Sequence, residues 1–157
     1  MKYKFMETAL KEEKKAYDIN EVPVGAIIVK DDIIISKAHN MKEIKKNVLK
    51  HAELIAIEKA SKKLRDWRLN NCILYTTLFP CPMCASAIQQ SRIKKIVYLN
   101  DDTNSITKNI SLQILNNINM NHQVEIEKTN IKKSLFNTFF KKIRTKSNVS
   151  RETLDEK

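Results

Sequence analysis

The chain has 157 residues, of which 42% are hydrophobic and 30% charged, and its formal net charge is +11. These values are ordinary for one soluble domain with a buried core, and no apolar run reaches the ~18–20 residues that cross a bilayer, which excludes a membrane-spanning protein. The charged, amphipathic N-terminus is not typical of a secretory signal, so we expect a cytoplasmic protein without a membrane partner. The lysine excess either favours binding to nucleic acid or reflects a composition rich in lysine, isoleucine and asparagine.

The first half of the chain predicts a helix, a β-hairpin and a second helix. Apolar residues at helical spacing among lysines and glutamates predict a helix over residues 3–18. The β-type run Val22–Val29, a Lys-Asp-Asp turn and the run Ile33–Ser36 predict a hairpin. After a polar, irregular segment at 39–50, we expect a helix from about His51 to Lys63.

The second half of the chain alternates strands with helices. We expect a polar loop at 100–109, strands at Ile73–Leu78, Ile93–Leu99 and Val124–Ile126, and helices at Pro80–Ser91, Leu112–Leu115 and Ile131–Ile143. The order strand, helix, strand favours parallel pairing through a right-handed crossover. We therefore expect an α/β three-layer sandwich, with a mixed sheet of about five strands and helices on both faces. Residues 1–144 are expected to form one domain, and residues 145–157 a polar, frayed tail.

The cysteine content points to metal or thiol chemistry. Three cysteines in a chain without a secretory signal argue against a disulfide framework. Cys72 lies in an apolar run and is expected to be a small buried residue. Cys81 and Cys84 stand at the predicted start of a helix, where free N–H groups and a partial positive charge lower the pKa of a thiol. A Cys-x-x-Cys pair by itself could bind a metal or act as a redox pair.

A histidine and a glutamate complete the candidate site. His51-Ala52-Glu53 also stands at the predicted start of a helix. One histidine and two cysteines leave the fourth position of a tetrahedral zinc open to water, as in catalytic rather than structural zinc sites. Glu53 is not needed as a ligand, so we expect it to carry protons. His39 and His122 have no comparable partners, and we expect them at the surface or behind the ligands.

His-x-Glu followed by Pro-Cys-x-x-Cys is the pattern of the zinc nucleoside and nucleobase deaminases. Within that superfamily, the chain resembles the tRNA-specific adenosine deaminases, which convert wobble adenosine to inosine. The resemblance runs from the first helix to about Arg144. The matching stretches are Glu21–Ala26, Ala38–Asn40, His51–Glu53, Pro80–Ala85, Ser91–Ile93, Asn119–Ile126 and Phe139–Arg144.

The resemblance implies a cytidine deaminase-like fold and a hydrolytic reaction that releases ammonia. It implies one Zn²⁺ per subunit, bound by His51, Cys81 and Cys84. It also implies that Glu53 is the catalytic residue, which takes a proton from the attacking water and passes it to the ring nitrogen and then to the departing amine.

The resemblance also implies how the substrate is bound. Asn40 and the backbone of Ala52 would hold the edge of the base. Phe140 and Arg144 would contact RNA, because unstacked bases are commonly held by aromatic and arginine faces. The implied partners are a tRNA anticodon stem–loop and a second copy of the chain in a homodimer.

Four features separate the chain from parts of the superfamily. Residue 79 is Phe, as in deoxycytidylate deaminases, where adenosine deaminases usually carry Glu. Residue 55 is Ile, where deoxycytidylate deaminases usually carry Asn, and cytidine deaminases commonly use Cys in place of His51. The loop at 100–106 keeps an aspartate but lacks the Lys-Thr-Gly run of the adenosine deaminases. Two other functions therefore stay open: a small-molecule deaminase acting on guanine or deoxycytidylate, and a non-catalytic zinc protein that binds RNA.

Overall fold

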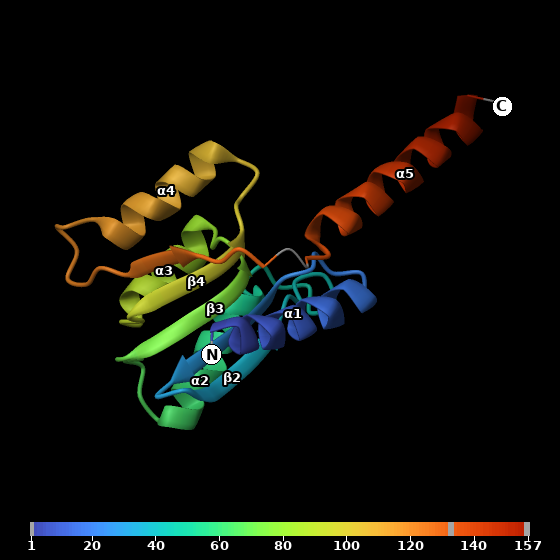
Figure 1. Cartoon of the computed structure of the whole chain (residues 1–157). Coiled ribbons are helices and arrows are strands. Elements are labelled where there is room, and N and C mark those ends of the chain that lie inside the picture. The colour runs from blue at the N-terminus through green and yellow to red at the C-terminus, as the bar shows by residue number, and fades with distance from the viewer. Residues whose placement is uncertain (1, 132–133, 156–157) are drawn as a thin grey trace.

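The computed structural model describes residues 2–131 and 134–155, and residues 147–155 by their backbone. Helices and strands alternate along the chain (Figure 1). Their order is α1 (Lys2–Asp18), β1 (Gly25–Lys30), β2 (Ile33–His39), α2 (Ala52–Leu64), β3 (Cys72–Leu78), α3 (Pro82–Gln90), β4 (Lys95–Asn100), α4 (Ser105–Asn116), β5 (Glu125–Lys128) and α5 (Phe136–Asp155).

Within the described residues, the strands form one five-stranded sheet in the order β2-β1-β3-β4-β5. β1 pairs antiparallel with β2 and β3, whereas β3, β4 and β5 are parallel. The hairpin between β1 and β2 turns at Asp31 and Asp32, which both have positive φ angles (51° and 62°). Aspartate tolerates this conformation better than most residues do. The expected hairpin, parallel crossover and mixed sheet are thus confirmed.

Helices cover both faces of the sheet. Ile27 and Val29 of β1 pack with Phe5 and Met6 of α1 in one cluster, on one face. Ile28, which points to the opposite face because side chains alternate along a strand, packs in a second cluster with residues of α2, α3 and α4. The expected three-layer α/β sandwich is therefore confirmed.

The single glycine of the chain lets α1 lie directly on β1. A Cβ atom built on Gly25 would lie 2.0 Å from the carbonyl oxygen of Ala9 and 2.4 Å from the backbone nitrogen of Glu13. No side chain fits between two backbones at that separation. Gly25 therefore allows α1 to lie close to the N-terminal end of β1.

The C-terminal third of the chain differs from the sequence expectation in two places. A helix is present at the expected Leu112–Leu115, but its predicted length was wrong, because α4 already begins at Ser105 within the expected polar loop. The Asn104 side chain caps α4 by accepting hydrogen bonds from the backbone N–H groups of Ile106 and Thr107. The polar sequence of the first turns hides this helix, since only its later residues Ser111 and Leu115 are buried.

The last helix begins and ends later than expected. α5 runs from Phe136 to Asp155 and includes residues that were expected to form a frayed tail. Lysine, arginine and glutamate are good helix formers, and neither proline nor glycine interrupts this stretch. Positions 132–133 of the expected helix and 156–157 of the expected tail lie outside the described residues. The division into a domain at 1–144 and a tail stays a prediction.

α5 projects from the body of the protein and contacts it near its N-terminal end (Figure 1). Phe139, at 8% exposure, packs edge-on against Tyr17 of α1 with the ring centroids 6.3 Å apart. No helix within the described part of the chain is long and apolar enough to cross a membrane.

Candidate active site

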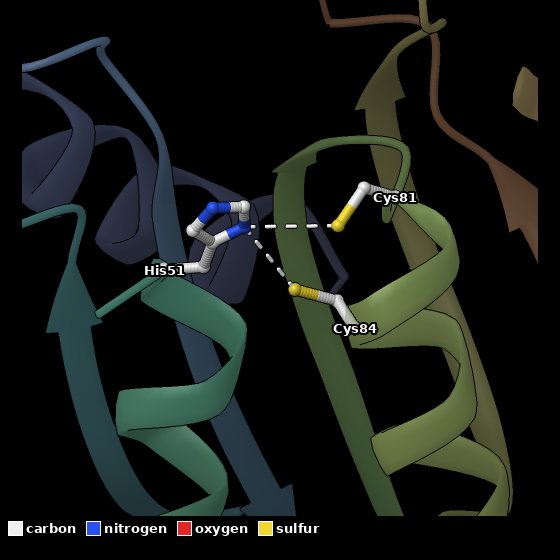
Figure 2. A group of neighbouring side chains, drawn as sticks. All are labelled: His51, Cys81 and Cys84. Carbon is white, nitrogen blue, oxygen red and sulfur yellow. Dashed lines mark hydrogen bonds between the residues drawn. The ribbon is translucent and has the colours of Figure 1, made fainter. Parts of the chain in front are cut away.

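Two helix N-termini meet at one end of the sheet and carry the candidate ligands. His51 is the N-cap of α2 and Cys81 the N-cap of α3, and both have extended backbones. Pro82 follows as the first residue of α3, where its fixed φ angle suits a helix start and its missing N–H is not needed. Neither N-cap side chain makes the side-chain hydrogen bond that usually caps a helix. Both side chains are therefore free to point across the gap between the helices, and together with Cys84 they do so (Figure 2).

The three side chains form a compact donor set. His51 Nδ1 lies 3.7 Å from Cys81 Sγ and 3.5 Å from Cys84 Sγ, and the three ligand atoms lie within 4.8 Å of one another. In a tetrahedral zinc site with Zn–N bonds of about 2.0–2.1 Å and Zn–S bonds of about 2.3 Å, the nitrogen and sulfur atoms are about 3.5 Å apart. The spacing and the donor types both fit zinc.

The charges of the donor set also fit a divalent cation. The pKa of Cys81 is lowered to about 4, mainly because the Cys84 thiol donates a hydrogen bond to the Cys81 thiolate and secondarily because His51 does so. The same contact raises the pKa of Cys84, and burial and the nearby Glu53 raise it further. The pKa of His51 is raised mainly by its hydrogen bond to Cys81. A cation such as Zn²⁺ would supply the positive charge that lets both sulfurs be thiolates.

Glu53 lies beside the donor set without belonging to it. Its side chain is buried at 4% exposure, one oxygen is 3.6 Å from Cys84 Sγ, and the other is 3.4 Å from Thr76 Oγ1. Burial is the main reason why the pKa of Glu53 is raised. A carboxylate with a raised pKa exchanges protons more readily near neutral pH. The geometry therefore suits a proton carrier next to a metal.

The donor set opens into a cavity of about 220 Å³, which we call the metal cavity. The predicted site residues Asn40, His51, Ala52, Glu53 and Cys81 all lie in its wall. Residues that the sequence analysis gave no role complete the lining: Val22, Val24, Lys42, Leu78, Phe79 and Asp102. The signal that could have identified Asp102 is the pair of aspartates directly after β4, because ligands of α/β sheets bind beyond the carboxyl ends of the strands.

The irregular segment between β2 and α2 forms one wall of the cavity. The Asn40 carboxamide donates to the Val22 carbonyl (3.2 Å) and accepts from the Lys42 N–H (3.3 Å), which fixes its orientation. Glu21, which is fully buried, accepts hydrogen bonds from the backbone N–H groups of Glu43 and Ile44 at 3.1 and 2.7 Å. Hydrogen bonds thus hold this loop against Glu21 and Val22, the residues that lead into β1.

The two predicted RNA-contact residues lie at a second hollow. Phe140 and Arg144 of α5 line a space of about 310 Å³ together with Thr103 and three further residues of α5, and neither lines the metal cavity. Asp102 belongs to the wall of the metal cavity and Thr103 to the second hollow, so the two spaces adjoin along the backbone. The structure brings the catalytic candidates together and places the RNA-contact candidates next to them.

The remaining histidines and the third cysteine lie outside the donor set. His39 Nδ1 pairs with a carboxylate oxygen of Glu12 at 3.0 Å. His122 Nε2 donates to the Ile93 carbonyl at 2.7 Å. Cys72 is fully buried in the apolar cluster under α2 and α3, which confirms the expectation of a small core residue.

The chain matches known deaminases in sequence. A family model of MafB19-like deaminases matches residues 2–144. The tRNA-specific adenosine deaminase of Bacillus subtilis (strain 168) is 37% identical over 155 residues, which cover 97% of this chain and 96% of the relative. The enzyme of the same name from Aquifex aeolicus (strain VF5) is 42% identical over 142 residues, which cover 89% of this chain and 94% of the relative.

The structure matches solved deaminases as well. A structure from a study of A-to-I editing by tRNA:A34 deaminases at the wobble position is 32% identical, with a TM-score of 0.75, and the match covers 82% of this chain and 98% of that one. A guanine deaminase from Bacillus subtilis is 28% identical, with a TM-score of 0.62 and a coverage of 91% and 93%. The sequence match over residues 2–144 includes the cavity residues, both helix N-termini and all five strands of the sheet.

Proposed function

Since the chain belongs to the tRNA-specific adenosine deaminases among the MafB19-like deaminases, we propose that it converts the wobble adenosine of a tRNA anticodon loop to inosine and releases ammonia. The chain is an enzyme, a hydrolytic deaminase. The observation that carries the proposal is a compact donor set of His51, Cys81 and Cys84, with Glu53 beside it, at the wall of one cavity. The chain that holds this set matches these enzymes over nearly its whole length.

We propose that His51, Cys81 and Cys84 hold one zinc ion per subunit. When bound, zinc supplies a water that ionises near neutral pH. Glu53 would take a proton from that water as the water oxygen adds to C6 of adenine, and would deliver this proton to the neighbouring ring nitrogen. Glu53 would then take the proton of the new C6 hydroxyl and pass it to the amine, so that the C6–N bond breaks, the C6 carbonyl forms and ammonia leaves. Its burial supports this role, because a carboxylate with a raised pKa can both accept and return a proton. Oriented proton transfer of this kind contributes about 10²–10⁴-fold to the rate.

The size and lining of the cavity support recognition of a single base. A volume of about 220 Å³ lies below the ~300–1,000 Å³ of pockets for drug-sized ligands. Deaminases that act on nucleic acids extrude the target base into such a pocket and read its edge by hydrogen bonds. Asn40 and the backbone of Ala52 are the groups that we assign to this edge, and both lie in the cavity wall.

We assign the flanking RNA contacts to α5. Phe140 and Arg144 line the hollow next to the cavity, and Lys141 and Lys142 are exposed beside them. An aromatic face, a guanidinium and exposed lysines are the groups that hold unstacked bases and phosphates. The net charge of +11 supports the same assignment. The curated relatives favour a tRNA substrate over guanine or deoxycytidylate.

A panel of substrates tests the proposed substrate class. The zinc-loaded protein is incubated with an anticodon stem–loop that carries wobble adenosine, and in parallel with free adenosine, guanine and deoxycytidylate. We expect inosine in the stem–loop and no deamination of the small molecules. Turnover of a free base or nucleotide without turnover of the stem–loop would overturn the proposal.

We further propose a homodimer that works in the cytoplasm, where a substrate such as tRNA would be found. Large apolar side chains are exposed along α4 and the loop that follows it: Ile106 at 71%, Ile110 at 45%, Ile118 at 87% and Met120 at 39%. Apolar groups gathered on a surface mark interaction sites. Light scattering should give twice the mass of one chain, and Ile110→Glu should shift the mass toward the monomer. A wild-type monomer at micromolar concentration would contradict the dimer.

A further inference from the structure

We propose that Glu13 of α1 is a positioning residue for RNA binding, because its buried carboxylate fixes where α5 leaves the body beside the active site. This inference rests on the proposed function, since it takes α5 as an element that contacts RNA. Glu13 itself lies outside the metal cavity and touches neither the donor set nor the base pocket.

The carboxylate of Glu13 caps the N-terminal end of α5 from another helix. Glu13 is 1% exposed, one oxygen accepts the Leu135 N–H at 2.6 Å, and the other accepts the Ser134 hydroxyl at 3.0 Å. Ser134 Oγ in turn accepts the N–H of Phe136, the first residue of α5, at 3.2 Å. The unpaired N–H groups and the partial positive charge at a helix start favour a carboxylate there. Glu13 thus binds the two residues that lead into α5, and through Ser134 it is linked to the first N–H of the helix.

The same hydrogen-bond network joins α5 to the ends of three strands. Asn100, at the end of β4, donates to Ser134 Oγ at 2.7 Å and to the Thr77 carbonyl at 2.9 Å. Thr77 Oγ1 accepts the N–H of Gly25 at 3.0 Å and also contacts Glu13. Glu13 therefore belongs to a network that fixes α1, α5 and the ends of β1, β3 and β4 relative to one another.

Each of these strand ends leads directly into the wall of the metal cavity. Val24 precedes Gly25, Leu78 follows Thr77, and Asp102 lies two residues beyond Asn100; Val24, Leu78 and Asp102 all line the cavity. The network thus fixes the position of α5 relative to the cavity that we assign to the base. The zinc-binding candidates stand at the starts of α2 and α3, which pack in the separate cluster on the opposite face of the sheet from α1.

A small tilt at the N-terminal end of α5 displaces the later residues of this helix by several ångströms. Residues 141–146 are exposed, and the helix projects away from the body (Figure 1). Arg144 lies nine residues beyond Leu135, which corresponds to about 13 Å along a helix at 1.5 Å per residue. A tilt of about 15° at the base therefore moves Arg144 by about 3.5 Å, which exceeds the length of a hydrogen bond. Loss of the Glu13 contacts should weaken RNA binding without changing the chemistry.

Kinetics of the full-length, zinc-loaded protein on the anticodon stem–loop test the inference. For Glu13→Ala we expect KM to rise about 5–10-fold, with kcat and zinc content within about twofold of wild type. Glu12→Ala is the matched control, because Glu12 is the neighbouring buried carboxylate of α1 and bonds Lys15 and His39 instead of α5. If Glu13→Ala does not fold, Ser134→Ala removes one bond of the same network, and we expect it to raise KM about 2–4-fold.

A double variant separates a positioning role from a general loss of stability. If Glu13 acts through α5, Glu13→Ala should raise KM no more than about twofold in an Arg144→Ala background. Hydrogen exchange at the Leu135 amide should be faster in Glu13→Ala. An unchanged KM in folded Glu13→Ala and Ser134→Ala, or a loss confined to kcat, would overturn the positioning role. If Arg144→Ala and Phe140→Ala themselves leave KM unchanged, the RNA-contact assignment fails and the inference fails with it; if they raise KM and Glu13→Ala does not, only the inference fails.

Discussion

Replacement of the single glycine by alanine, Gly25→Ala, should destabilise the protein strongly. The added Cβ would meet backbone atoms of α1, at 2.0 Å from the Ala9 carbonyl oxygen and 2.4 Å from the Glu13 nitrogen. Non-bonded heavy atoms are ordinarily about 3.5–4.0 Å apart. α1 would therefore have to move about 1.5 Å away from β1, because neither backbone can rotate out of the contact as a side chain could.

The expected loss in the free energy of unfolding depends on which atoms the added Cβ meets. Overpacking of a well-packed core typically costs about 1–3 kcal/mol and occasionally more. Because the blocked atoms belong to the backbone of a long helix, we expect about 3 kcal/mol, out of a total free energy of unfolding of about 5–15 kcal/mol. For a domain of this size, 1 kcal/mol corresponds to about 2–4 °C in Tm, so the expected loss is about 6–12 °C.

Urea and thermal unfolding followed by circular dichroism measure this loss. Glu7→Ala is the control, because Glu7 is exposed on the same helix and substitution there should change the free energy of unfolding by less than about 0.5 kcal/mol. A change of less than about 0.5 kcal/mol for Gly25→Ala as well would refute the close packing of α1 on β1. The same shift of α1 would displace Glu13, so the variant should also bind the stem–loop more weakly.

Three further predictions concern the site and its surroundings. Glu53→Gln should keep its zinc, as measured by metal analysis, and lose about 10²–10⁴-fold in kcat; a variant that keeps a tenth of the activity would contradict the proton-carrier role. Removal of zinc with a chelator should abolish turnover and added Zn²⁺ should restore it, whereas full activity of the metal-free protein would exclude a catalytic zinc. Hydrogen bonds from Lys108 and Lys128 lower the pKa of Asp101 to about 2, below the usual aspartate value of 3.8. Since the folded-state pKa is the lower one, the ionised carboxylate stabilises the fold above about pH 4, and this contribution is lost as the pH falls toward 2. All three groups are partly exposed to solvent, so the contribution is at most about 1 kcal/mol. Urea midpoints of wild type and Asp101→Asn should converge between pH 5 and pH 2.5, and a constant difference would refute the ion-pair account.

Local sequence was sufficient to predict the segments that carry the chemistry. His51 and Cys81 each stand where a polar or proline-marked boundary precedes an apolar helical pattern, and both are N-caps in the structure. The hairpin was equally readable, because a Lys-Asp-Asp turn separates two β-type runs. In each case the signal and the structure that it specifies lie within a few residues of one another.

Contacts between segments that are far apart in the sequence could not be predicted from local sequence patterns. Glu13 binds the backbone N–H of Leu135 and the hydroxyl of Ser134, and nothing in a lysine- and glutamate-rich helix distinguishes it from its exposed neighbours. Val22, Val24 and Leu78 read as ordinary strand residues, and only the assembled sheet brings them to one cavity. The start of α4 was missed because its cap, Asn104, stands in a run of polar residues that resembles a loop.

Phe79 shows how the structure accommodates a departure from the resembled deaminases. Its side chain is 1% exposed and packs edge-on against Tyr98, with the ring centroids 4.9 Å apart. An aromatic group there contributes apolar surface to the cavity wall, where a glutamate would add a second buried carboxylate beside Glu53. Phe79 therefore alters the wall of the proposed base pocket and leaves the candidate metal ligands in place.

Mapping inosine by position tests the central claim most directly. The zinc-loaded protein is given two anticodon stem–loops that differ only in whether the adenosine occupies the wobble position or the next position in the loop, and inosine and ammonia are both quantified. The account predicts inosine at the wobble position alone, with ammonia released in equal amount. Equal conversion at both positions, or no conversion of either stem–loop, would contradict it.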